Sequence, residues 1–335
     1  MLVEAVLDVR NDPIQAETAA VAAEAAGYDG IGIPETRTDV FTSLALAARA
    51  TERISLQSAI AVAFARNPMS LAMAANDIAF ISRGRFELAM GSQVRGHIER
   101  RFGMPWGRPA ARMEEYISTV RTIWARFADG ERLHTTGEFY SHTLLSEIFS
   151  PGPNPYGNPP ILLAAVGPRM TGVAGRAAEG IMCHPLTSRR YLADVLVPTL
   201  REARGGSLDG FTVSVPAFAV LGADAAERER AVAGVRRQLA FYASTPAYLP
   251  VLETHGWGEL HVRLNRLSRQ QAWDEMAGLI DDDVLDAFAV SGTPAEVAAA
   301  LLERFGDLAT RLSVNTPYDA DPALVVETAR HLRDA

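Results

Sequence analysis

Short runs of apolar residues alternate along the chain with longer stretches in which apolar residues return every three or four positions. Runs of about four to eight apolar residues are typical of buried strands, and the longer spacing is typical of helices with one apolar face. The predicted strands cover residues 2–8, 30–33, 54–63, 86–90, 161–165, 180–183, 211–221 and 312–315. The predicted helices cover 14–26, 42–51, 68–83, 110–127, 168–178, 191–204, 225–242 and a segment that starts at Pro294 with Thr293 as its N-cap.

Eight strands that alternate with helices predict an α/β fold with a parallel sheet, and eight such units close naturally into a (β/α)8 TIM barrel. A doubly wound open sheet is the alternative, although it usually stops at about five to seven strands. Two segments interrupt the alternation. Residues 129–159 are dense in Pro and Gly near their end, and residues 245–290 are helical without an obvious strand. We therefore expect one domain over residues 1–335, with insertions after the fourth and seventh strands.

Composition narrows the classes of partner. The chain has 335 residues, of which 48% are hydrophobic and 21% charged, and its formal net charge is −8. The basic residues are spread along the sequence without a run, so neither nucleic acid nor an anionic membrane is an expected partner. All of them are arginine, which excludes a Schiff-base lysine and a Walker-A lysine. A small-molecule substrate is the remaining expectation.

Cysteine usage and the N-terminus bear on location. Cys183 is the single cysteine, so no internal disulfide can form. The N-terminus has no basic segment followed by an apolar one, and no apolar run reaches the roughly 18 residues of a membrane helix. These patterns predict a cytoplasmic protein.

In a barrel of this kind, chemistry takes place at the carboxyl ends of the strands. The residues at those positions are poor in ionisable groups and lack the histidines and carboxylates of a metal centre, so we expect no metal. Glu35 follows the second strand and either faces a ligand or is a loop carboxylate. Cys183 and His184 are adjacent, so they point to opposite faces and cannot form a nucleophile and base pair. Cys183 is expected in the core, while His184 either reaches the pocket or is structural.

The segment from Ile161 to Gly180 carries a stronger signal. A strand ends in small residues, and Gly167 and Pro168 then start a helix whose first turn holds Arg169 and Thr171. Free N–H groups at a helix start, a guanidinium and a hydroxyl together predict an anion site. The alternative is that Gly167 and Pro168 only turn the chain and that Arg169 is a solvated charge. The loop GSQVRGH after the fourth strand is a weaker sign that a planar ligand or phosphate approaches closely.

Several strings together resemble the luciferase-like monooxygenase superfamily, and more closely its branch of coenzyme F420-dependent oxidoreductases. They are YDGIGIPET, FTSLALAARATERISLQSAI, ARNPMSLAMAANDIAFISRGRFELAMGS, FGMPWGRPAARMEEYISTVRTIW, PPILLAAVGPRMTGVAGRAAEGI and SGTPAEVAAALLERF. The resemblance covers nearly the whole chain. It implies a (β/α)8 barrel with insertions, a homodimer, and a flavin or deazaflavin at the carboxyl ends of the strands.

The resemblance also implies roles for particular residues. A β-bulge with a non-prolyl cis peptide at Ala59–Ile60 would press on one face of the ring. The loop after the fourth strand would border the ring, and the segment after the fifth would meet its polar edge and the phosphate. The implied cofactor-binding residues are Ala59, Ile60, Gly91, Ser92, Gln93, Val94, Arg95, Ala165, Val166, Gly167, Arg169, Met170 and Thr171.

Two positions depart from the pattern of the related alcohol and sugar dehydrogenases. Glu35 and Thr36 stand where those enzymes show an Asp-His pair, and Val94 stands where the sugar enzyme has a Glu. Both usual helpers of proton abstraction are thus absent. This favours reduction of an activated double bond or carbonyl, or oxygenation, with Glu35, Thr36 and His184 as the candidate catalytic residues.

Three functions remain open from the sequence. The first is an oxidoreductase that moves a hydride between F420 and a small organic substrate. The second is an FMN-dependent monooxygenase supplied by a separate reductase, and the third is a barrel that binds the cofactor without turnover. Aromatic residues of the two insertions and of the helix between them favour an apolar ligand; they are Tyr156, Tyr242, Tyr248 and Trp257.

Overall fold

The computed structural model describes residues 1–7, 9 and 12–335. Within them, eight strands pair in the order β10-β12-β1-β2-β3-β5-β8-β9, and β9 pairs again with β10. The pairs β1–β12, β10–β12, β2–β3, β3–β5 and β5–β8 are all parallel. This closed parallel ring defines a (β/α)8 barrel, which confirms the predicted fold class. The last residue of the predicted strand 2–8 lies outside the described residues.

Contacts along the chain group it into two compact units, which we call the N-terminal and C-terminal units. The N-terminal unit comprises residues 5–164 and 172–181, and the C-terminal unit comprises residues 1–4, 165–171 and 182–335. The chain therefore passes between the units inside β1, β8, α6 and β9. One domain over residues 1–335 stays a prediction.

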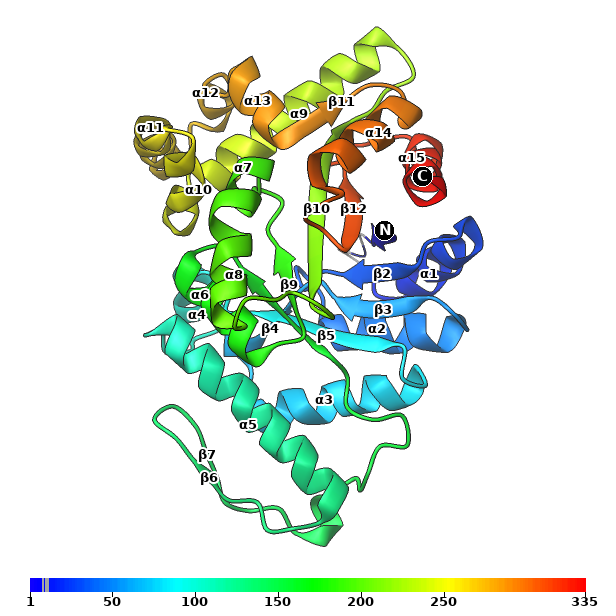
Figure 1. Cartoon of the computed structure of the whole chain (residues 1–335), viewed down its shortest axis with the longest axis vertical. Helices are drawn as coiled ribbons and strands as arrows, with labels where there is room; N and C mark the ends of the chain where they lie inside the picture. Colours follow the sequence, from blue (N-terminus) through cyan, green and yellow to red (C-terminus); the bar gives the residue numbers. More distant parts are fainter. Residues whose placement is uncertain (8, 10–11) are drawn as a thin grey trace. The chain divides into compact units, whose positions relative to one another are not determined.

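The N-terminal unit carries the first half of the alternation. Its helices α1, α2, α3 and α5 pack each against the next (Figure 1). Their apolar faces close over a core whose largest side chains include Trp124, Tyr116, Phe64 and Phe86. The elements are α1 Gln15–Ala26, β2 Gly30–Ile33, α2 Val40–Ala50, β3 Ser55–Ser58, β4 Ala61–Val62, a 3-10 turn Ala63–Ala65, α3 Pro68–Ile81, β5 Phe86–Gly91, α4 Arg95–Arg100, α5 Pro109–Asp129, β6 Thr135–Thr136, β7 Ser141–His142, a 3-10 turn Glu147–Phe149 and β8 Ile161–Ala165.

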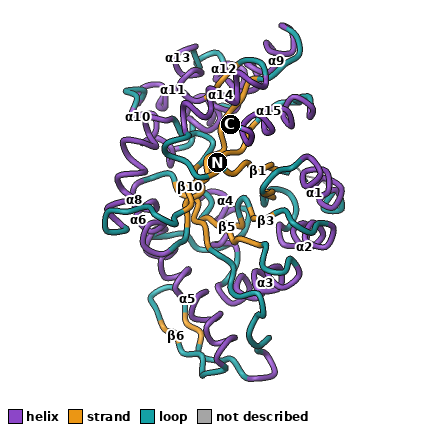
Figure 2. The backbone as a smooth tube through the Cα atoms, turned by 45° about the vertical axis from the view of Figure 1, so that its right-hand side comes forward, coloured by secondary structure: helices purple, strands orange, loops and turns teal. Residues whose placement is uncertain are grey.

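The C-terminal unit holds the second half. Its core includes Tyr191, Phe218, Phe288 and Phe305, and α14 packs against α15 (Figure 2). Thr293 caps α14, as predicted, and the structure adds a capping box with Glu296. The elements that lie in it wholly or in part are β1 Leu2–Val6, α6 Pro168–Ala177, β9 Gly180–Cys183, α7 Arg189–Tyr191, a π-helical turn Leu192–Leu196, α8 Val197–Ala203, β10 Thr212–Val220, α9 Ala225–Ala243, a 3-10 turn Pro246–Tyr248, α10 Leu249–Thr254, α11 Gly258–Arg269, α12 Trp273–Ala277, α13 Asp282–Phe288, β11 Ala289–Ser291, α14 Pro294–Phe305, β12 Arg311–Asn315 and α15 Pro322–Asp334.

The structure corrects four local predictions. The strand expected over 54–63 is interrupted between Ser58 and Ala61, and the Gly-rich loop after β5 contains the short helix α4. The helix expected from Thr42 begins at Val40, because the Asp39 carboxylate accepts hydrogen bonds from the amides of the first turn. The segment 245–290 is helical as expected, but it runs directly into β11, which pairs with β10.

Candidate functional site

Glu35 stands just beyond β2, and its carboxylate is fully engaged. Its Oε2 accepts hydrogen bonds from the Val62 amide and from Arg66 Nη1, each at 2.7 Å, and its Oε1 accepts from Arg66 Nη2 at 2.5 Å. The same Arg66 Nη2 donates to Asp39 Oδ2 at 2.6 Å. The Glu35 side chain is 8% exposed and that of Arg66 is 17% exposed. We call Glu35, Arg66 and Asp39 the charged cluster.

The Arg66 guanidinium keeps its positive charge inside the charged cluster. Burial lowers the pKa of the Arg66 guanidinium, but its hydrogen bonds and attraction to Glu35 and Asp39 outweigh that effect, so the pKa is raised overall. Arg66 therefore stays charged and balances Glu35. Because Glu35 also holds the amide of Val62 in β4, it fixes the backbone just after the interruption at residues 59–60. Sequence reasoning singled out Glu35 but missed Arg66 and Asp39.

The interruption between β3 and β4 is the feature that the resemblance implied. The Ala59–Ile60 peptide bond is cis, which confirms that expectation, and the Ala59 amide donates to the Ile33 carbonyl at 2.8 Å. The Ile60 side chain lies so close to Gly91 that a Cβ on Gly91 would stand 2.7 Å from Ile60 Cδ1 and 3.2 Å from Ala164 Cβ. Glycine at position 91 thus lets an apolar side chain lie directly against the end of β5.

The loop after β5 is held by its own polar groups. Gln93 is a non-glycine residue at φ 58°, and its side chain accepts a hydrogen bond from the Val94 amide at 2.9 Å. Ser92 Oγ donates to the Gln93 carbonyl at 3.1 Å. Left-handed backbone at a non-glycine residue costs of order 1 kcal/mol and is concentrated at ligand sites, so this loop stays a candidate.

Two other predicted residues of the N-terminal unit lie at the surface. Arg95 is the first residue of α4; its side chain is 71% exposed and pairs with Glu99 at 2.9 Å. This pairing raises the pKa of Arg95. Thr36 is exposed, and its carbonyl accepts a hydrogen bond from the Arg101 guanidinium. Arg95 therefore already has an anionic partner, whereas the Thr36 hydroxyl has no bond among the described residues.

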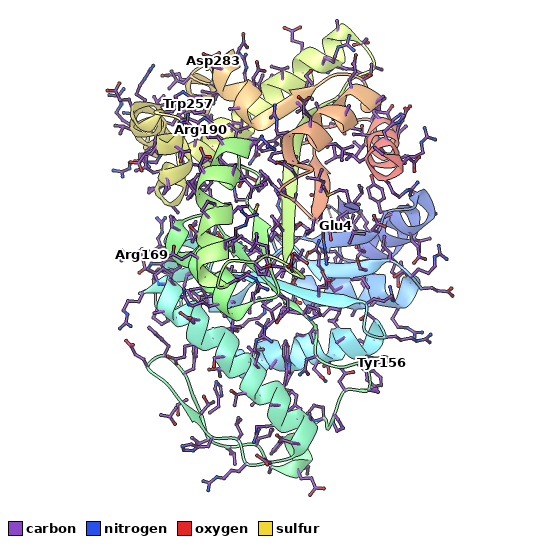
Figure 3. The ribbon with its side chains drawn as sticks, in the orientation of Figure 1. Glu4, Tyr156, Arg169, Arg190, Trp257 and Asp283 are labelled. Carbon is purple, nitrogen blue, oxygen red and sulfur yellow. The ribbon has the colours of Figure 1, made fainter. Side chains whose placement is uncertain are left out.

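The predicted anion site belongs to the C-terminal unit. Arg169 is exposed at the start of α6 (Figure 3) and has no ion-pair partner in the described part of the chain. The amides of Met170 and Thr171 both donate to the Gly167 carbonyl at 3.1 Å, and so does the hydroxyl of Thr171, which is fully buried. The helix start thus offers fewer free N–H groups than the sequence suggested, and the Arg169 guanidinium is the main group left for an anion.

The backbone before α6 has a second support, which sequence reasoning missed. Tyr191 is completely buried and its hydroxyl donates to the Val166 carbonyl at 2.8 Å. Burial, with a smaller effect of Cys183, raises the pKa of Tyr191 to about 12. The phenol therefore keeps its proton and holds residues Ala165 to Gly167 in place. The residues around Tyr191 in the sequence show no local pattern that predicts this contact.

His184 directly follows β9 and is largely buried. Its ring centroid lies 4.4 Å from that of Tyr242 and 4.3 Å from that of Tyr248. Burial lowers the pKa of His184 to about 3, so the imidazole is neutral at physiological pH. Cys183 is buried, as predicted, and burial raises the pKa of its thiol to about 12. In the described residues, His, Cys, Asp and Glu form no group that could hold a metal ion.

Comparison with known proteins places the chain in a family. The luciferase-like monooxygenase family matches residues 6–311, so the chain belongs to it. An uncharacterized protein of Mycobacterium tuberculosis is 47% identical over 299 residues, which cover 88% of each chain.

Another protein of Mycobacterium tuberculosis carries the provisional name of a coenzyme F420-dependent oxidoreductase. It is 30% identical over 290 residues, which cover 81% of this chain and 82% of its own. The solved structure of the coenzyme F420-dependent tetrahydromethanopterin reductase of Methanopyrus kandleri has the same fold. Its TM-score is 0.81 at 20% identity, over 99% of this chain and 98% of that one. The chain is thus a luciferase-like protein with F420-dependent relatives, as expected. Among the described residues, no helix is both long and apolar enough to cross a membrane.

Proposed function

We propose that the protein is an F420-dependent oxidoreductase that transfers a hydride between the deazaflavin cofactor and a small organic substrate. Its family and its relative with a provisional F420-dependent name support the proposal. The observation that carries it is the close packing of Ile60 on Gly91 next to the cis peptide, which brings the apolar groups of Ile60 and Ala164 together at the ends of β5 and β8. An apolar wall of this kind suits a flat heterocycle.

The residues present fit such a cofactor. Each unit has residues to which the resemblance gives a role. In the N-terminal unit, Ala59 and Ile60 would face the ring and the segment from Gly91 to Val94 would border it. In the C-terminal unit, Arg169 would attract the phosphate. The polar edge of the ring would be approached by Ala165, Val166 and Gly167. The hydrogen bond from the Tyr191 hydroxyl to the Val166 carbonyl holds this segment. Met170 and Thr171 support Arg169 from the first turn of α6. The bound deazaflavin supplies two-electron hydride chemistry.

The chain's own polar groups then have distinct roles. Glu35 is a positioning residue, because its oxygens hold Val62 and Arg66, and proton donation would require it to give up these bonds. The Thr36 hydroxyl is an accessible candidate for contact with substrate or water. The protein is proposed to act in the cytoplasm and as a homodimer. Sedimentation of the purified protein would test the homodimer.

Titration with the two candidate cofactors tests the proposal. We expect F420 to bind at micromolar concentration, with the change in its fluorescence as the readout. We expect FMN to bind at least about tenfold more weakly, which is a difference of about 1.4 kcal/mol in binding free energy. Absence of F420 binding at micromolar concentration would contradict the proposal. Tighter binding of FMN would favour the monooxygenase that depends on a separate reductase.

Turnover separates an enzyme from a pure binding protein. The F420-loaded protein is mixed with enones, aldehydes and alcohols, and bleaching or recovery of the deazaflavin absorbance is followed. We expect steady turnover with at least one enone or aldehyde acceptor when the reduced cofactor is supplied. Binding of F420 without turnover in any of these mixtures would favour the non-catalytic alternative.

A further inference from the structure

The rings of His184, Tyr242 and Tyr248, which we call the aromatic cluster, hold one imidazole in a fixed place within the C-terminal unit. His184 follows the last residue of β9, Tyr242 is part of α9, and Tyr248 ends the turn before α10. The Tyr242 ring meets the imidazole edge to face at 75°, and the Tyr248 ring is tilted by 35° against it. Two aromatic rings at these distances restrict the rotation of the imidazole.

The hydrogen bond to one ring nitrogen determines which nitrogen carries the proton. The Leu186 amide donates to His184 Nδ1 at 3.1 Å. A nitrogen that accepts a hydrogen bond carries no proton, so the neutral ring has its hydrogen on Nε2. Since burial keeps the ring neutral at physiological pH, His184 presents a single N–H donor of fixed direction.

The donor nitrogen is available. In the described part of the chain, His184 Nε2 has no hydrogen-bond partner. The polar atoms that are both unbonded and fully buried do not include it, so Nε2 keeps some exposed surface. The Tyr248 hydroxyl is in the same situation, and burial raises its pKa to about 12, so it keeps its proton. The ring centroid of Phe218 lies 6.4 Å from that of Tyr242, which adds an apolar neighbour to the cluster. The aromatic cluster therefore combines an apolar surface with two accessible donors.

Building on the proposed function, we propose that His184 Nε2 and the Tyr248 hydroxyl bind the oxygen of a carbonyl group on an apolar substrate. Two donors match the lone pairs of a carbonyl oxygen, and a neutral imidazole in this role polarises the carbonyl without being an acid. An alcohol substrate would need an acceptor for its hydroxyl proton, which a protonated Nε2 cannot provide. The substrate class is therefore ketones, enones or quinones rather than alcohols.

A pair of matched probes tests this proposal. Acetophenone and ethylbenzene have the same ring and differ in the carbonyl oxygen, and their binding is measured by ligand-observed NMR on the F420-loaded protein. We expect the wild type to prefer acetophenone about fivefold, as one net hydrogen bond allows. F420 binding is measured first by fluorescence, so a failure of the cofactor proposal is seen separately from a failure to prefer the carbonyl.

Variants locate the preference. His184→Phe keeps a ring and should lose the acetophenone preference while its ethylbenzene affinity stays unchanged. His184→Gln restores an N–H near the Nε2 position and should recover part of the preference, and Tyr248→Phe should reduce it about twofold. His255→Phe is the matched control, because His255 stacks on Trp257 and bonds to Ser188, and it should leave the preference intact. An equal preference in wild type and His184→Phe, or no preference in the wild type, would overturn the proposal.

Discussion

The charged cluster of the N-terminal unit and the aromatic cluster of the C-terminal unit are organised in opposite ways. In the first, every carboxylate oxygen of Glu35 is bonded and Arg66 serves two carboxylates. In the second, neutral rings hold one another by contact, and the donor groups of His184 and Tyr248 are left without partners among the described residues. A fully bonded polar group positions the chain, whereas an accessible one is suited to bind a ligand.

The largest expected effect comes from removing one member of the charged cluster. Glu35→Leu leaves the largely buried Arg66 guanidinium with Asp39 as its remaining carboxylate partner, besides the Val62 carbonyl at 3.3 Å. We expect a loss of about 2–4 kcal/mol in the free energy of unfolding. Urea unfolding at neutral pH measures it.

The control is Asp39→Asn. This carboxylate is 50% exposed, and asparagine still caps α2, so the loss should stay below about 1 kcal/mol. If both variants lost equal stability, the cluster would not be centred on Glu35.

The next effect sharpens the difference in packing. Gly91→Ala places a methyl group 2.7 Å from Ile60 Cδ1, and we expect a loss of about 1–2 kcal/mol in unfolding free energy and weaker F420 binding. Ile60→Val removes the Cδ1 methyl group of Ile60, so the double variant should recover most of the lost stability. Gly107→Ala is the control, because a Cβ at position 107 would meet nothing within 4 Å and the residue has no proposed contact with the cofactor. A double variant no better than Gly91→Ala would exclude this contact as the cause.

The aromatic cluster should make the free energy of unfolding depend on pH, because it contains His184. Since burial lowers the folded-state pKa of His184 to about 3, the unfolded chain takes up a proton below pH 6.5 while the folded chain does not. Stability is therefore lost as the pH falls from 6.5 towards 3. We expect His184→Phe to lose about 1–2 kcal/mol less than the wild type between pH 7 and pH 5. Urea unfolding at both pH values checks this, and identical losses would mean that His184 titrates normally.

The smallest effect concerns a single neutral hydrogen bond. Tyr191→Phe removes the hydroxyl that supports the Val166 carbonyl, and the free energy of unfolding should fall by about 1 kcal/mol. Thermal or urea unfolding measures the loss. A larger loss than that of Glu35→Leu would reverse the ranking of charged over neutral contacts.

Periodicity predicted most of the fold because long apolar patterns record burial. The order of the eight barrel strands and most helix ranges follow from it, and Thr293 and Pro294 mark the start of α14 correctly. It failed at short elements. The six residues of α4 include Gly96 and have no side-chain cap, and β11 has three residues directly after α13. Such segments are too short to show a period.

The site was predictable only in part. Resemblance predicted the cis peptide at Ala59–Ile60, which the structure confirms, and it proposed the ends of β5 and β8 as cofactor contacts, which stay a prediction. It did not predict the partners that fix these segments. Arg66 lies 31 residues from Glu35 in sequence, and Tyr191 lies 25 residues from Val166. Contacts at that separation depend on how the strands are ordered, which one sequence does not encode locally. The cofactor-binding role of Arg95 stays a prediction, and its pairing with Glu99 argues for a surface role.

The amide of Leu186 has one more consequence for His184. An imidazole whose Nδ1 is tied to the backbone has a single usable nitrogen, and so it cannot pass a proton from one side of the ring to the other. Any hydrogen that ends on the oxygen of a reduced product must then come from the Tyr248 hydroxyl or from water. Reactions run in deuterium oxide should therefore show the same solvent isotope effect in the His184→Phe protein as in the wild type.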